Sequence, residues 1–138
     1  MGFAEDVELV VEALGPSVAG YNRVLGALVV NTYSVVDGES YRLVVYPTDG
    51  YPDEPPAVYV APYPVYVQRK KRFKESHVRS CCLKKRVGGV NVCFFHVQSG
   101  RWRELRGDGG LAVLLMHVLQ ALDLRVPRLS YSLYTRPR

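Results

Sequence analysis

The chain has 138 residues, of which 48% are hydrophobic, with a formal net charge of +5 and an isoelectric point near 9.2. This length is typical of one domain, and the apolar content is sufficient for a packed core. No apolar run approaches the roughly 20 residues of a membrane-spanning helix, and the N-terminal segment is acidic, unlike a signal peptide. We therefore expect a single soluble, cytoplasmic domain over residues 1–138, with no membrane partner.

An amphipathic helix is predicted at the start of the chain. Apolar residues recur there at helical spacing, and acidic residues occupy the other faces. Gly15 and Pro16 then end the helix, because glycine accepts a left-handed cap and proline cannot continue a helix. The apolar stripe, which needs a surface to pack on, consists of Phe3, Val7, Val10, Val11 and Leu14.

Three β-strands are predicted next, over residues 24–33, 41–46 and 58–67. Val, Leu and Tyr dominate each run, and these residues favour the pleated surface of a sheet. Asp37-Gly38-Glu39 indicates a turn between the first two strands, and the proline-rich residues 47–56 separate the second and third. The strands should form an antiparallel meander.

The remainder of the chain predicts a long loop followed by a second helix. Residues 68–90 are rich in Lys and Arg with little apolar periodicity, which indicates an exposed loop, and residues 90–97 form a short apolar stretch. The last residues, 128–138, are expected to be a loosely attached tail. The second helix should be largely buried, with His117 as a hydrogen-bonded packing residue, and its stripe consists of Leu111, Leu114, Leu115, Val118 and Leu122.

These elements predict an α+β fold, in which helices cover one face of an antiparallel meander of about four strands. The most specific signal lies in YRLVVYP (residues 41–47) and YPDEPPAVYV (residues 51–60). Prolines fix φ and withhold hydrogen-bond donors, so they form a rigid, non-pairing link under which Tyr51 can pack. This segment resembles the strand, YPxxPP turn and strand of ubiquitin-conjugating enzymes.

The order of elements is also similar to that family over about residues 4–124. The resemblance implies a UBC-like fold with an N-terminal helix, a β-meander, a proline-rich turn, a long loop and a buried C-terminal helix. It also implies that Cys93, which precedes Trp102 as the catalytic cysteine precedes a tryptophan in the family, is the nucleophile. Cys93 would accept a ubiquitin-like protein from an activating enzyme as a thioester and pass it to an amine.

A second cysteine competes for this role. Cys82-Leu83 lies five residues after His77 and resembles the His-to-Cys-Leu arrangement of some bacterial relatives, with His77 as a supporting residue. Cationic side chains of the long loop would favour a thiolate. The family's His-Pro-Asn motif is absent, because Val78 and Arg79 follow His77, so no oxyanion-stabilising asparagine is assigned.

Two alternatives need no cysteine chemistry. Cys93 lies between Val92 and Phe94, as a buried structural cysteine would, and RWD-like members of the same fold class bind proteins without a catalytic thiol. The third and least favoured reading is a basic nucleic-acid-binding domain, since phosphates attract the Lys and Arg residues of the loop. The many tyrosines fit strand and turn positions, which explains them without nucleic acid.

Zinc binding is a further alternative, because thiolates and imidazoles are the usual ligands of zinc. The chain lacks a CxxC pair, so we expect no metal site and no cofactor. The residues that such a site would use are His77, Cys81, Cys82, Cys93 and His96.

Overall fold

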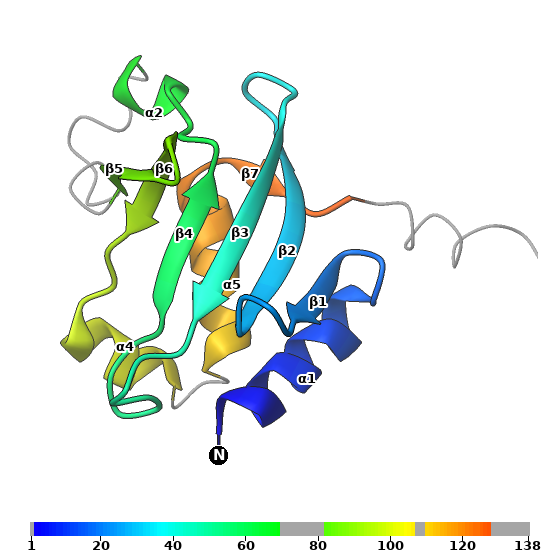
Figure 1. Ribbon diagram of the computed structural model, residues 1–138, viewed down its shortest axis with the longest axis vertical. Helices are drawn as coiled ribbons and strands as arrows, with labels where there is room; N and C mark the ends of the chain where they lie inside the picture. The colour runs from blue at the N-terminus through cyan, green and yellow to red at the C-terminus, as the bar shows by residue number, and fades with distance from the viewer. Residues whose placement is uncertain (1, 70–81, 107–109, 128–138) are drawn as a thin grey trace, which may run out of the picture.

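The computed structural model describes residues 2–69, 82–106 and 110–127. They form an α+β arrangement, as predicted, built on a seven-stranded sheet. In Figure 1, α5 (Leu111–Ala121) lies behind the sheet, and α1 (Phe3–Leu14) packs beside β1 and against α5. The opposite face of the sheet is turned toward the viewer in Figure 1. In the described ranges, no helix has both the length and the apolar character needed to cross a bilayer.

The sheet is antiparallel at every described pairing. Its strands lie in the order β1-β2-β3-β4-β6-β5, and β7 pairs with the end of β2. The bounds are β1 Ala19–Asn22, β2 Ala27–Ser34, β3 Ser40–Tyr46, β4 Ala57–Ala61, β5 Cys82–Val87, β6 Val90–Phe95 and β7 Leu124–Arg125. The predicted meander corresponds to β2, β3 and β4, and β6 continues it.

The expectation of about four strands was too low, because β1, β5 and β7 lack an apolar pattern. β5 lies at the edge of the sheet and is exposed beyond Cys82, and half of its residues are basic. Part of the predicted loop is therefore a β-hairpin with β6, while residues 70–81 lie outside the described residues, as does the predicted tail. The predicted third strand was too long, since β4 ends at Ala61 and α2 (Tyr66–Arg69) follows.

The core lies between the sheet and the helices. Alternate residues of the central strands are fully buried, as in β3 and β4, where Leu43, Val45, Val58 and Val60 are each 0% exposed. Full burial of such a side chain stabilises the fold by about 1.5–3 kcal/mol. The predicted stripe of α1 is confirmed, because Val7 and Val10 are buried and the other members pack against the core.

The second helix is buried on one face only. Leu111, Leu114, Leu115 and Val118 are buried, as predicted, whereas Met116 and His117 point to solvent and Met116 is 60% exposed. The prediction that His117 is a packing residue was therefore wrong. A helix that covers a sheet presents one stripe to it and leaves its outer face in water.

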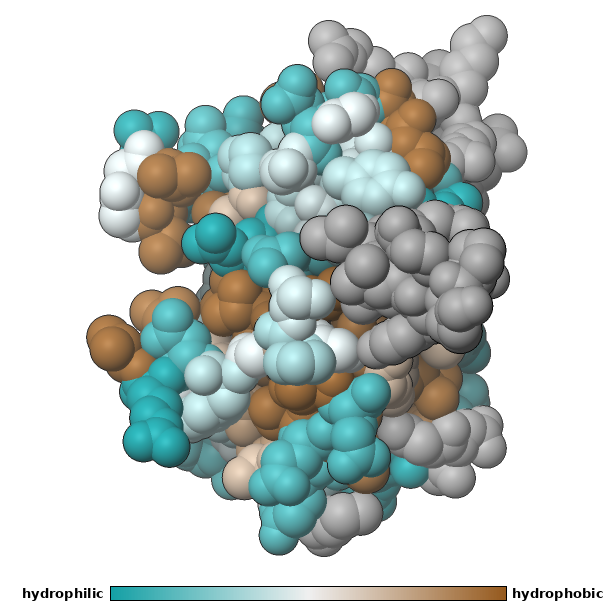
Figure 2. All heavy atoms as spheres, turned by 90° about the vertical axis from the view of Figure 1, so that its right-hand side faces the viewer, coloured by the Kyte–Doolittle hydropathy of each residue, from teal (hydrophilic) through white to brown (hydrophobic). Residues whose placement is uncertain are grey.

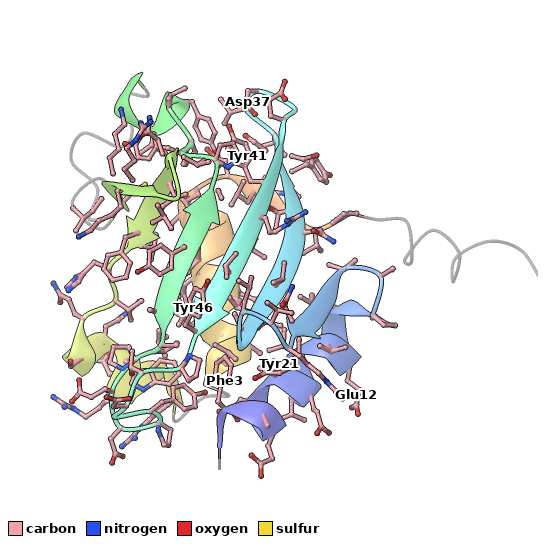
Figure 3. The ribbon with its side chains drawn as sticks, in the orientation of Figure 1. Phe3, Glu12, Tyr21, Asp37, Tyr41 and Tyr46 are labelled. Atoms are coloured by element: carbon pink, nitrogen blue, oxygen red, sulfur yellow. The ribbon has the colours of Figure 1, made fainter. Side chains whose placement is uncertain are left out.

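The turn between β2 and β3 is held by Asp37. Its carboxylate accepts hydrogen bonds from the Tyr41 hydroxyl at 2.6 Å and from the Glu39 N–H at 2.9 Å, and Gly38 takes a φ of 73°. Figure 3 shows Asp37 and Tyr41 together at this end of the sheet. Desolvation opposes ionisation of Asp37, but hydrogen bonds from Tyr41, Glu39 and Ser34 outweigh it, so the pKa of Asp37 lies below its usual value.

Substitution Asp37→Asn should destabilise the protein in a pH-dependent way. A lowered pKa in the folded state means that the charged carboxylate stabilises the fold above its unfolded pKa of about 3.9, and this stabilisation is lost as the pH falls through the folded value. We expect a loss of no more than about 1 kcal/mol at neutral pH, because the pair is partly exposed and screened. Urea unfolding followed by circular dichroism at neutral pH and at about pH 3 measures it.

The matched control is Glu39→Gln, which removes a neighbouring charge but keeps the backbone N–H that bonds to Asp37. It should change the free energy of unfolding less than Asp37→Asn does. If Asp37→Asn lowered the free energy of unfolding by the same amount at neutral pH and at about pH 3, the result would contradict this account.

Candidate functional site

The structure places the two candidate nucleophiles on the inner side of the sheet. Cys93 lies on β6, in register with Val60 of β4 and Lys84 of β5, and its side chain is 0% exposed. Cys82 begins β5 and is 6% exposed. Strand alternation puts both thiols on the side of the sheet that the helices cover. An acyl group on another protein cannot reach either sulfur in this arrangement.

Of the other residues of the predicted sites, Cys82 shares the covered face of the sheet with Cys93, and two lie outside the described part of the chain. His77 and Cys81 lie outside the described residues, and His96 is exposed just after β6. Within residues 2–69, 82–106 and 110–127, no three His, Cys, Asp or Glu side chains are grouped so as to hold a metal ion. The two histidines of the described residues, His96 and His117, are exposed, whereas Cys93 is buried.

The proline-rich link, residues 51–56, is clamped between two helices. Tyr51 donates a hydrogen bond from its hydroxyl to the carboxylate of Asp6 in α1, and its ring meets Phe3 edge-on at 5.4 Å. Burial, together with the Asp6 carboxylate, raises the pKa of Tyr51, so the phenol stays a donor. Tyr51 thus packs as the sequence predicted, and it ties the link to the N-terminal helix.

The second clamp comes from α4 (Ser99–Arg106), a helix that the sequence did not predict. Trp102 is 1% exposed, and its Nε1 donates to the Pro52 carbonyl oxygen at 2.7 Å. Arg106 donates to the same oxygen at 3.0 Å and to the Asp53 carboxylate at 2.9 Å. Trp102 is therefore a structural anchor, and it does not line an approach to Cys93.

The face of the sheet away from the helices carries a continuous apolar row. Its members stand opposite one another in register across β2, β3, β4, β6 and β5. All but one are half-buried, and the last, Leu83, is 41% exposed. The row consists of Val29, Val44, Tyr59, Phe94 and Leu83.

Aromatic rings extend this row along the sheet. Tyr59 lies 5.9 Å from Tyr46 and 5.1 Å from Phe94, and Phe94 lies 6.4 Å from His96, between ring centroids. The ammonium group of Lys85 lies 5.8 Å from the centroid of Phe94. Tyr46, labelled in Figure 3, forms one end of this track, which we call the aromatic track (Tyr46, Tyr59, Phe94 and His96).

The far end of the track opens into a hollow beside the proline-rich link. Phe94 and His96 contribute to its wall, and α4 contributes Ser99. The Ser99 hydroxyl donates to the Glu54 carboxylate at 3.0 Å across this hollow. The remaining walls are formed by Thr48, Gly50, Glu54, Pro55, Pro56, Ala57 and Val97.

Charge is segregated between the sheet and the first helix. None of the seven strands contains Asp or Glu, and their charged residues are Arg42, Lys84, Lys85, Arg86 and Arg125. The described carboxylates lie instead in α1, in the connections and, as Glu104, in α4. Strand alternation places Arg42 and Lys85 on the same face as the aromatic track.

The exposed apolar side chains on the side of the molecule that carries α1 and β1 do not form such a continuous row. Figure 2 shows the side of the molecule that carries α1 and β1, where hydrophobic patches are interrupted by hydrophilic side chains. Leu9 of α1 is 53% exposed, and Val24 and Leu25 in the β1–β2 turn are 95% and 47% exposed. Scattered exposure of this kind is ordinary for a protein surface. The sheet face that no described helix covers, which we call the uncovered face, is the stronger candidate site.

Comparison of the chain with protein-family models, with curated proteins and with solved structures finds no match. The UBC-like assignment therefore stays a prediction that depends on the proline-rich segment and the order of elements. The sequence reasoning missed the sheet-face site, although Tyr59 and Phe94 stand out as aromatics that alternate with small or buried neighbours. Their proximity depends on the pairing of β4 with β6.

Substitution Trp102→Phe should lower the free energy of unfolding by about 1–3 kcal/mol, because it removes the indole donor and leaves the Pro52 carbonyl with a weaker set of partners. Urea unfolding followed by far-ultraviolet circular dichroism measures the change, since Trp102 is the chain's single tryptophan and its fluorescence is lost in the variant. The matched control is Arg103→Ala on the exposed side of α4, which should stay within about 0.5 kcal/mol of the natural protein. Equal effects of both substitutions would contradict the anchoring role.

Proposed function

We propose that this chain is a non-catalytic binding module of the UBC-like class that acts through the uncovered face of its sheet. The observation that carries this proposal is the complete burial of Cys93, whose side chain is 0% exposed. Thioester formation needs a sulfur that an incoming carbonyl can approach. Cys93 instead packs within the core, opposite Val60.

The alternative nucleophile is no better placed. Cys82 is buried at 6% exposure on the same side of the sheet, and it belongs to the same hydrophobic core. Both thiols therefore fit the role of small apolar packing residues, which is common for cysteine. In this arrangement neither sulfur could receive a ubiquitin-like protein as a thioester from an activating enzyme.

The uncovered face supports a binding role directly. It holds five apolar side chains in one row and a set of rings in mutual contact, and the strands that carry Tyr46, Tyr59 and Phe94 are each paired on both sides. Contiguous apolar surface of this kind marks interaction sites on soluble domains. The strands hold the rings in place before a partner arrives, which reduces the entropy lost on binding.

Brief alkylation of the native protein should leave Cys93 and Cys82 unmodified. Intact-mass spectrometry and peptide mapping give the labelling of each cysteine, and the substitution Cys81→Ser removes ambiguity with its neighbour. The same protein in denaturant, where every thiol is accessible, is the control and should be fully labelled. Rapid and selective labelling of native Cys93 would overturn the proposal in favour of modifier transfer.

A further inference from the structure

We propose that the uncovered sheet face binds single-stranded nucleic acid, with bases stacked on Tyr59 and Phe94 and phosphates contacting Arg42 and Lys85. This inference rests on the proposed binding function and names the partner of that same face. It differs from the attraction of phosphates to the basic loop, because the binding groups lie on strands whose positions the structure describes.

The rings provide the first argument. Tyr46, Tyr59 and Phe94 come from β3, β4 and β6, and each has a neighbouring ring centroid within 6 Å. They are half-buried, so each ring is supported by the sheet while part of it stays open to solvent. Unpaired bases stack on such rings with little dependence on sequence, whereas a paired duplex hides the faces of its bases.

The charges provide the second argument, and they favour nucleic acid over a protein partner. Arg42 and Lys85 are exposed on the face that holds the track, and none of the seven strands carries a carboxylate that would repel phosphates. The Lys85 ammonium group lies over the Phe94 ring, so a base that stacks on this ring would displace the ammonium group, which could then contact the adjoining phosphate. Aromatic rings interleaved with cations are the usual surface for single strands.

The hollow at the end of the track provides the third argument. It adjoins Phe94 and His96 and also holds the hydroxyl groups of Thr48 and Ser99. The Glu54 carboxylate in its wall would repel a phosphate, but it can accept hydrogen bonds from the amino group of a base. The hollow could therefore hold a base that is turned out of the bound nucleic-acid strand, while the phosphates of that strand contact Arg42 and Lys85.

Fluorescence anisotropy with labelled oligo-deoxythymidine and oligo-uridine of about 12 nucleotides tests this inference, with a duplex of the same length for comparison. Both single strands should bind more tightly than the duplex. Tyr59→Leu and Phe94→Leu keep apolar volume but remove the stacking surface, and each should weaken binding about fivefold or more. Arg42→Gln and Lys85→Gln should each reduce the slope of log affinity against log salt by about 0.7.

Matched controls lie on other surfaces of the same chain. Tyr21→Leu removes a tyrosine that is 50% exposed and stands opposite buried Leu28, and Arg103→Gln removes a cation from the exposed side of α4. Neither should change the affinity or the salt slope. Circular dichroism verifies the fold of every variant, and Arg42→Gln tests the face without removing the Lys85 ammonium group that lies over Phe94.

Three results would overturn the assignment of nucleic acid: no binding of either single strand, equal binding of the duplex, or equal losses in Tyr21→Leu and Phe94→Leu. If Cys93 remains protected from alkylation in that case, the binding-module proposal stands and its partner belongs to another class. If native Cys93 is labelled rapidly, the binding-module proposal itself fails, whatever the oligonucleotides do.

Discussion

Strand alternation under one-sided cover is the constraint on which the rest of this structure depends. Successive side chains of a strand point to opposite faces, and here the helices cover one of those faces. The inner set, with Val58, Val60 and Cys93, is sealed from water. The outer set, with Tyr59 and Phe94, becomes the surface that a partner can reach. Consecutive residues of a strand therefore differ in burial, because one packs in the core and the next lies on the outer face.

The proline-rich link connects this sheet to its helices. Pro52 withholds a backbone donor, but its carbonyl oxygen accepts hydrogen bonds from Trp102 and Arg106 of α4. Tyr51, one residue earlier, reaches Asp6 of α1. The segment thus fixes two helices against one end of β3 and β4, and it also forms a wall of the hollow beside the aromatic track. The proline-rich link therefore shapes the hollow beside the aromatic track, although it forms only part of the wall of that hollow.

Charge is also divided between the helices and the sheet. α1 is acidic in its first turn, where carboxylates interact favourably with the helix dipole. β5 is basic at the edge of the sheet, where charged side chains oppose pairing with another chain. These placements favour the fold, and they also make the outer face of the sheet a cationic surface next to half-buried rings. The net charge of +5 alone does not show where on the molecule this cationic surface lies.

The sequence by itself determined the features that depend on local pattern: α1 with its end at Gly15, the turn at Asp37 and the rigid link after Tyr51. It also gave the α+β class, because runs of Val, Leu and Tyr lie between two helical stripes. These predictions succeed because helix periodicity, turn chemistry and proline geometry act over a few residues. The sequence did not predict β5, because an exposed edge strand needs no alternation of apolar and polar residues.

Only the tertiary structure decided which face of each strand is covered. Val92, Cys93 and Phe94 are consecutive and all apolar, so their sequence cannot say whether the sulfur or the ring points inward. The position of α5 behind the sheet settles it, with Cys93 inside. The aromatic track depends in turn on the register of β4 with β3 and β6, which joins residues up to 48 positions apart, from Tyr46 to Phe94. Such long-range pairing is set by the burial of the whole core, and no local pattern encodes it.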